Sequence, residues 1–251
     1  LEADRNTLLI GFGGGVVTDI AGYVASIYMR GIACAYVPTS LLNLVDASIG
    51  GKTGVDVGKF KNMIGTIRQP EFILQDLSLL KTLPQEEWAN GFAEIIKHAC
   101  IFDSQHFTLL QERNLSYYQQ NINELSDLIN RNILLKYKVV AADEFEKGER
   151  KLLNFGHTIG HALENIYSLS HGQAVAIGMV LAAKISEKEL GFRDTLAIER
   201  LLTQYQLPNS ISFHKDAILP FLNMDKKRKG DAIQFIALSS FGDAKIIPLS
   251  L

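Results

Sequence analysis

Three of the six histidines fall within fifteen residues of one another, at His157, His161 and His171. On a helix, His157 and His161 would share one face because they are four residues apart. His171 follows a turn-like segment, Ser168–Ser170, that would fold it back toward that face. A lone buried histidine is more often structural than a ligand. Three so close together, with glycines beside them, favour a metal site or an acid–base site.

A catalytic metal site needs a further ligand while it keeps one position open. Glu94 is a candidate, because it lies among small and apolar neighbours in the run Asn90–Ala99. The same glutamate could instead be a half-exposed helical residue that pairs with Lys97 or His98 at helical spacing. The spacing leaves both interpretations open.

Arg150, Asn154 and His157 follow one another at steps of four and three, which on one helix would form a single stripe. A guanidinium, an amide and an imidazole placed in this way suit an anionic, hydroxylated ligand. The alternative is a solvated helix face, but the apolar residues between them leave little room for one. A second polar group surrounds the glycine-rich turn Gly50–Gly54: Asp46, Lys52, Lys61 and Asn62.

A short apolar run, Thr7–Ile10, ends in glycines and is followed by a helical pattern over Val16–Arg30. Such a strand–glycine–helix start can bind phosphate, because glycine lets the backbone approach and the helix N-terminus attracts negative charge. The spacing Gly11-x-Gly13-x-x-Val16 lacks the third glycine of the usual dinucleotide fingerprint, and no acidic residue ends the next strand. The motif is therefore compatible with a nucleotide site and with a plain tight turn.

These residues are positioned by secondary-structure elements, and the predicted type of these elements changes near residue 84. Before it, strand patterns at 7–10, 32–37 and 72–74 surround a helix, which predicts an α/β domain over residues 1–84. Residues 85–251 are predicted to be mainly helical, with long helical patterns at 88–100, 122–142, 157–167 and 174–190. Apolar runs at 233–238 and 244–248 predict a hairpin near the end.

Composition narrows the class of protein. A formal net charge of -2 argues against non-specific nucleic-acid binding. Two cysteines without a CxxC spacing favour a reducing compartment. The sequence has no apolar run of about 18 residues and does not begin like a signal peptide, so we expect a cytoplasmic protein that does not act in a membrane. The basic run Lys226–Lys229 could be a solvated loop or an anion site.

Nine segments together resemble the 3-dehydroquinate synthase family. They are Gly13–Ala25, Tyr28–Gly31, Val37–Leu42, Val45–Thr53, Lys61–Asn62, Leu80–Pro84, Gly91–Glu94, Leu152–Ala162 and His171–Met179. The similarity is collinear from about residue 7 to 230 and rich in polar residues, so it is more specific than one glycine loop. It implies a dehydroquinate synthase-like fold, with a Rossmann-like α/β NAD-binding domain, incomplete here, before an all-α metal- and substrate-binding domain.

The resemblance also implies roles for individual residues. The cofactors would be NAD and one divalent metal, zinc or in its place cobalt, and the metal ligands would be Glu94, His157 and His171. His161 and Glu146 would transfer protons. The NAD contacts would be Gly14, Gly15, Val16, Asp19, Thr39, Ser40, Lys61 and Thr82. The substrate contacts would be Asp46, Lys52, Asn62, Lys97, Lys136, Arg150, Asn154, one of Lys226 or Lys227, and Arg30 from a neighbouring subunit of a homodimer.

The implied activity converts 3-deoxy-D-arabino-heptulosonate 7-phosphate to 3-dehydroquinate and phosphate, in the shikimate pathway of aromatic amino acid biosynthesis. The alternatives are another sugar phosphate cyclase, a glycerol dehydrogenase-like metal and NAD enzyme, and an α/β regulator with a vestigial site. Arg150, Asn154 and His161 match the dehydroquinate pattern, and the filled chemical positions disfavour the regulator.

The start of the sequence leads to one more expectation. A dinucleotide-binding sheet is built from several strand–helix units of roughly 30 residues each. Here the glycine turn follows only ten residues, and an acidic group for the adenosine ribose is missing downstream. We therefore expect an N-terminally truncated form that lacks ~60–90 residues and binds NAD poorly.

Overall fold

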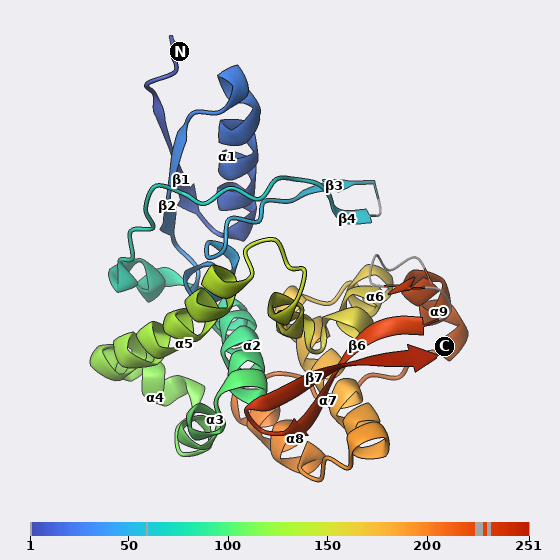
Figure 1. The fold of residues 1–251 in the computed structure, drawn as a ribbon. Coiled ribbons are helices and arrows are strands. Elements are labelled where there is room, and N and C mark those ends of the chain that lie inside the picture. The colour runs from blue at the N-terminus through green and yellow to red at the C-terminus, as the bar shows by residue number, and fades with distance from the viewer. Residues whose placement is uncertain (1, 59, 224–227, 230–231, 251) are drawn as a thin grey trace. The chain divides into compact units, whose positions relative to one another are not determined.

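The computed structural model describes residues 2–58, 60–223, 228–229 and 232–250 (Figure 1). The chain forms two compact units. The first consists of Leu1–Gly91 and Ile122–Phe145, and the second of Phe92–Asn121 and Glu146–Leu251. Our predicted boundary at residue 84 treats the domains as consecutive segments, whereas the first unit also takes in a later helix. The division into domains at residue 84 stays a prediction.

The first unit is built on a strand–helix–strand motif. Strand β1 (Leu8–Gly13) and strand β2 (Ala33–Pro38) pair in parallel, with Leu8 opposite Ala33 and Gly13 opposite Pro38. Helix α1 (Gly15–Ile27) makes the crossover that parallel pairing requires. The strands and the helix confirm the predicted α/β start. The third predicted strand forms only an isolated parallel bridge, between Ile73 and Tyr36.

The packing of α1 explains part of the glycine pattern. Ala21 and Ala25 of the helix pack with Ile32, Cys34 and Tyr36 in one buried cluster. A Cβ atom at residue 11 would lie 2.9 Å from the Cβ of Ala21. Glycine at this position therefore lets the helix lie close to the strand, independently of any ligand.

Further elements of the first unit were not all predicted. They are the 3-10 helix η1 (Tyr28–Arg30), the π-helix η2 (Asn43–Ala47), the antiparallel strands β3 (Val55–Val57) and β4 (Phe60–Ile64), the 3-10 helix η3 (Leu77–Thr82) and helix α5 (Ile122–Ala142). Helix α5 has the predicted bounds. Helix α2 (Gln85–Phe102) begins in the first unit and continues into the second.

The second unit is mainly helical. It contains α3 (Ser104–Gln111), α4 (Leu115–Gln120), the 3-10 helix η4 (Glu149–Asn154), α6 (His157–Tyr167), α7 (His171–Leu190), α8 (Thr195–Gln204) and α9 (Lys215–Asn223). The predicted C-terminal hairpin is confirmed by strands β6 (Ala232–Ser240) and β7 (Asp243–Ser250), with the short strand β5 (Arg228–Lys229) beside β6. Among the residues described, no helix is both long and apolar enough to span a membrane.

Helices α6 and α7 approach each other closely because small residues face the contact. A Cβ atom at residue 178 would lie 2.0 Å from the carbonyl oxygen of Gly156, and one at residue 160 would lie 2.9 Å from that of Ala174. Ser170 caps the start of α7 in a capping box with Gln173. These local features place the first residues of both helices, His157 and His171, next to each other, with their ring centroids 5.5 Å apart.

Candidate active site

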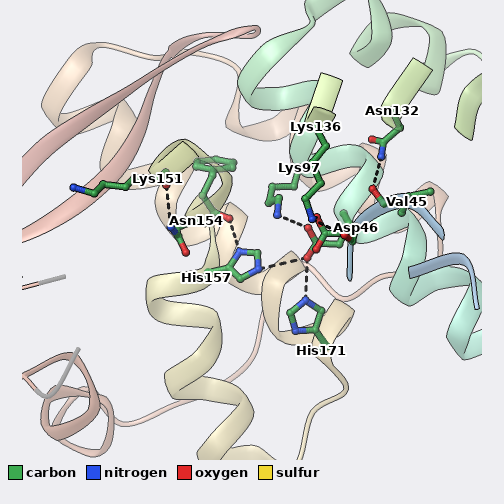
Figure 2. Close-up of polar contacts among 11 residues, drawn as sticks. Val45, Asp46, Lys97, Asn132, Lys136, Lys151, Asn154, His157 and His171 are labelled. Carbon is green, nitrogen blue, oxygen red and sulfur yellow. Dashed lines mark hydrogen bonds and ion pairs between the residues drawn. The ribbon is translucent and has the colours of Figure 1, made fainter. Parts of the chain in front are cut away.

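A buried carboxylate meets two imidazoles in the second unit (Figure 2). Glu94, from α2, has no solvent exposure. Its Oε1 atom lies 2.9 Å from Nε2 of His171 and 3.5 Å from Nε2 of His157. Its Oε2 atom pairs with the buried Lys97 one helical turn later. Of the two interpretations of Glu94, the half-exposed residue is therefore wrong, although the pairing with Lys97 does occur.

The chemistry of this cluster fits a divalent metal. One ligand atom each from Glu94, His157 and His171 lies within 4.8 Å of the others. Nδ1 of His157 lies 3.1 Å from the carbonyl oxygen of Phe155, which can only accept, so Nδ1 carries the hydrogen. The Nε2 lone pair then faces the carboxylate, as in metal sites where a backbone carbonyl orients the ligand. One carboxylate and two imidazoles also form the donor set of known catalytic zinc sites.

Electrostatics favour the neutral form of His157. Burial lowers the pKa of this imidazole well below its usual value, and the positive charge of Lys97 acts in the same direction. The carboxylate of Glu94 opposes both effects. A neutral imidazole is the form that binds a metal, because protonation would occupy the donor lone pair.

His161 lies beside this cluster, with its ring centroid 5.2 Å from that of His157 and 6.4 Å from that of His171. The structure thus brings the three predicted histidines together. His161, Glu164 and His171 form a second group whose ligand atoms lie within 4.8 Å of one another. His171 belongs to both groups, so distances alone do not show which histidines bind a metal and which transfer protons. The proton-transfer role of His161 stays a prediction.

The predicted single stripe of Arg150, Asn154 and His157 is wrong. Helix η4 ends at Asn154, and α6 begins at His157. Between them Gly156 has a φ of 76°, a left-handed conformation that breaks the helical repeat. Arg150 is nonetheless buried, and the Asn154 amide donates to Oε1 of Glu146 at 2.8 Å. The same amide donates to the carbonyl of Lys151 at 3.1 Å (Figure 2).

The glycine turn of the first unit lies against the segment that follows β2. The carbonyl oxygen of Gly13 accepts a hydrogen bond from the backbone N–H of Thr39 at 2.9 Å. A Cβ atom at residue 14 would lie 3.7 Å from Oγ of Ser40. Gly14 is the N-cap of α1, and its carbonyl oxygen accepts from the N–H groups of Val17 at 3.1 Å and Thr18 at 3.2 Å, so the turn and the start of the helix are joined. The N-terminus of a helix attracts negative charge. These residues fit the phosphates of a dinucleotide, and the adjacent Val16 is exposed.

Asp19 and Asp46 both belong to a polar group of the first unit that includes Lys136. Burial raises the pKa of Asp19 to about 7, and the charge of Asp56 contributes in the same direction. A backbone hydrogen bond from Gly54 and the charge of Lys136 oppose the rise. Nζ of Lys136 lies 2.6 Å from Oδ1 of Asp46 and 2.5 Å from its carbonyl oxygen (Figure 2). The structure therefore brings Asp46 and Lys136 together as a pair.

Four of the remaining predicted residues lie on exposed parts of the first unit. Their side chains are solvent-exposed at Arg30, Lys52, Asn62 and Thr82. The backbone of Lys61 belongs to β4, but its side chain lies outside what the structure describes, as do Lys226 and Lys227. Sequence reasoning missed two buried polar residues under the glycine turn, Thr18 and Asn43. An amide within the apolar run Leu41–Val45 is a signal that could have been used, because a buried amide needs partners.

The chain resembles known proteins along nearly its whole length. The family model described as 3-dehydroquinate synthase N-terminal matches residues 1–90, and the one described as 3-dehydroquinate synthase C-terminal matches residues 91–228. A 3-dehydroquinate synthase of Dehalococcoides mccartyi (strain CBDB1) is 42% identical over 250 residues, which are 97% of this chain and 69% of that protein.

Two solved structures are also similar. A 2-deoxy-scyllo-inosose synthase in complex with carbaglucose-6-phosphate, NAD+ and Co2+ has a TM-score of 0.87 and 30% identity, covering 99% of this chain and 72% of that one. ValA, a 2-epi-5-epi-valiolone synthase from Streptomyces hygroscopicus subsp. jinggangensis 5008 with NAD+ and Zn2+ bound, has a TM-score of 0.85 and 30% identity, covering 96% and 69%.

Proposed function

The chain belongs to the 3-dehydroquinate synthase family, and on that premise we propose that it is a phosphate-eliminating lyase. Its substrate would be 3-deoxy-D-arabino-heptulosonate 7-phosphate, and its products 3-dehydroquinate and phosphate. This reaction serves the shikimate pathway, which leads to chorismate and the aromatic amino acids. The observation that carries the proposal is the 42% identity to a 3-dehydroquinate synthase along 97% of the chain, against 30% for the related cyclases.

The proposed cofactors are NAD and one divalent metal, most simply zinc, with cobalt as a substitute. Two related cyclase structures were obtained with NAD+ and Co2+ or Zn2+. In this chain Glu94, His157 and His171 would hold the metal, supported by their mutual distances and by the neutral His157. When bound, NAD would supply a reversible oxidation of a substrate hydroxyl, and the metal would polarise substrate oxygens.

The substrate carries a phosphate and a carboxylate, so its binding needs several cations. Lys52, Lys97 and Arg150 would supply them, and the planar guanidinium of the buried Arg150 suits a carboxylate. Oxidation of a ring hydroxyl acidifies the neighbouring C–H bond, and loss of that proton expels phosphate. Re-reduction, ring opening and an internal aldol addition then close the carbocycle. Since one site would host every step, its residues act mainly by holding one substrate conformation.

Proton transfers would fall to His161 and Glu146. His161 is half-buried beside the proposed metal ligands, and Glu146 accepts a hydrogen bond from Asn154, which would fix its carboxylate. Asp46, Lys136 and Asn62 would orient the polyhydroxylated part of the substrate. The proposed NAD contacts are Gly14, Gly15, Val16, Asp19, Thr39, Ser40, Lys61 and Thr82.

The assembly proposed is a homodimer in which Arg30 reaches the substrate phosphate of the neighbouring subunit. Arg30 is exposed at the end of η1, where its φ of 71° and the following Gly31 turn the chain away from α1. We place the enzyme in the cytoplasm, since Cys34 and Cys100 are both free thiols, which suits a reducing compartment.

The test measures phosphate release from the heptulosonate phosphate, with and without prior removal of metal by a chelator. We expect release that depends on added Zn2+ or Co2+ and catalytic NAD, with no net NADH. Steady accumulation of NADH would instead indicate a glycerol dehydrogenase-like enzyme. Release from glucose 6-phosphate, with none from the seven-carbon acid, would indicate another sugar phosphate cyclase. A Glu94→Gln variant serves as the matched inactive control.

A further inference from the structure

Two buried polar side chains lie directly under the glycine turn. Thr18, in α1, is 1% exposed, and Asn43, the first residue of η2, has no exposure. The side-chain amide of Asn43 donates to the carbonyl oxygen of Gly13 at 2.9 Å. The hydroxyl of Thr18 lies 3.1 Å from Oδ1 of Asn43 and 3.0 Å from the carbonyl oxygen of Gly15. The pair therefore contacts the backbone on both sides of Gly14.

The chemistry of the partners fixes the orientation of the Asn43 amide. The carbonyl oxygen of Gly13 can only accept, so the NH2 group must face it. Oδ1 must then face Thr18, whose single O–H hydrogen is shared between Oδ1 and the carbonyl oxygen of Gly15. Removing this hydroxyl would leave a buried amide oxygen without that donor, which is unfavourable. Thr18 thus holds Asn43, and Asn43 holds the carbonyl of the turn.

The same asparagine also begins the segment that carries Asp46. The backbone oxygen of Asn43 accepts from the N–H of Ser48 at 3.2 Å and from its hydroxyl at 2.6 Å, which closes the π-turn. π-helical turns are rare and often occur at functional sites. From the other side, the Asn132 amide donates to the carbonyl of Val45 at 2.9 Å (Figure 2). A continuous series of hydrogen bonds therefore links the glycine turn to this segment.

We propose that Thr18 and Asn43 are positioning residues that hold the NAD-binding glycine turn and the Asp46 segment in one fixed arrangement. The inference rests on the proposed function, because it takes the turn as the site of the cofactor phosphates. Both side chains are buried, so they act through the Gly13 carbonyl and the first turn of α1. A fixed turn keeps the N–H groups at the start of α1 directed at the phosphates, and preorganised donors bind an anion more tightly than mobile ones.

The decisive variant is Thr18→Val, which keeps the shape of the side chain and removes the hydroxyl. We expect the dissociation constant of NAD, measured by calorimetry well below the melting temperature, to rise about tenfold. Thr18→Ser should restore binding to near the original value. Asn43→Ala combined with Thr18→Val should bind no more weakly than Asn43→Ala alone, because the two side chains act through one link.

Ser186→Ala is the matched control. The hydroxyl of Ser186 is also buried, donates to the carbonyl of Ala182 at 2.7 Å and accepts from the N–H of Leu238 at 2.9 Å, in the contact between α7 and β6. This variant should lower the melting temperature without changing NAD affinity. If Thr18→Val behaves in the same way, the two residues only stabilise the fold and the inference is wrong.

Two further outcomes have defined meanings. If Thr18→Val does not fold, the test uses Asn43→Asp instead. This substitution turns the amide donor that faces the Gly13 carbonyl into an acceptor and changes the shape of the side chain little. Unchanged NAD affinity in Asn43→Asp would overturn the inference. If the unaltered chain shows no NAD binding by calorimetry and none in competition with NADH fluorescence, the proposed function itself fails, and the inference fails with it. If the unaltered chain binds NAD and the variants bind it more weakly, both the proposed function and the inference are supported.

Discussion

The raised pKa of Asp19 makes a direct prediction about stability. A carboxyl group with a folded-state pKa of about 7 holds its proton more tightly in the folded chain than in the unfolded chain, where the value is near 3.8. Stability is therefore lost as the pH rises from about 4 to 7 and is constant above that range. Each pKa unit corresponds to about 1.4 kcal/mol, so full burial would cost about 4 kcal/mol at pH 8. Asp19 is only half-buried, and solvent screening reduces the figure to about 2 kcal/mol.

Asp19→Asn should remove this cost because the amide stays neutral. We expect the variant to be more stable than the unaltered chain by about 2 kcal/mol at pH 8 and to differ little at pH 4.5. Burial raises the pKa of the neighbouring Tyr36 hydroxyl, so this group stays protonated throughout the window. Urea unfolding followed by circular dichroism at several pH values measures the difference.

Asp76→Asn provides the control with the opposite sign. Hydrogen bonds from Ser78 lower the pKa of the exposed Asp76, which caps the helix η3, so its neutralisation should destabilise the chain at neutral pH. A stability difference for Asp19→Asn that is the same at pH 4.5 and pH 8 would refute the argument, because it could not come from the ionisation of Asp19.

The other predictions concern the metal, the dimer and the α6–α7 contact. Alanine at Glu94, His157 or His171 should remove the metal and nearly all activity, whereas His161→Ala should keep the metal and lose turnover. Mass spectrometry measures the metal content of each variant, and loss of the ion from His161→Ala would contradict the ligand assignment. Inactive Arg30→Ala chains mixed with inactive His157→Ala chains should regain some activity through one intact hybrid site, and verified mixed dimers that stay inactive would count against a shared site. Gly178→Ala should cost about 3 kcal/mol and weaken metal binding, because its Cβ would lie 2.0 Å from the Gly156 oxygen. Gly191→Ala is the control, because a Cβ atom added at residue 191 would have no atom within 4 Å. Its left-handed backbone should lower the free energy of unfolding by only about 1 kcal/mol, and metal binding should stay unchanged.

Regular elements with strong periodicity could be predicted from the sequence. Helix α5 was expected over 122–142 and occupies those residues, because its apolar residues repeat at helical spacing for almost six turns. The β1–α1–β2 motif and the β6–β7 hairpin were found for similar reasons. The histidine cluster was also visible, since three rare side chains lie close together in the sequence.

What the sequence did not reveal depends on backbone conformation and on distant contacts. The break between η4 and α6 needs a left-handed residue, and Gly156 alone does not distinguish such a break from a helix with one glycine in it. The π-turn of η2 is stabilised by Asn132, almost ninety residues away in the chain. Thr18 and Asn43 meet only after α1 has packed on the sheet, so their spacing in the sequence carries no helical or strand periodicity.

The position of the two imidazoles at helix starts explains why the cluster is suited to a cation despite having Lys97 nearby. His157 and His171 are the first residues of α6 and α7, where the helix dipole is positive and disfavours a protonated ring. Burial of His157 acts in the same direction, so protons compete weakly for its lone pair. Glu94 then supplies the negative charge that neutral imidazoles cannot. Lys97 pairs with Oε2, while Oε1 faces both rings, and one donor atom from each of the three residues lies within 4.8 Å of the others. The glycines between α6 and α7 therefore contribute to the site as well, since a wider contact between the helices would separate the two rings.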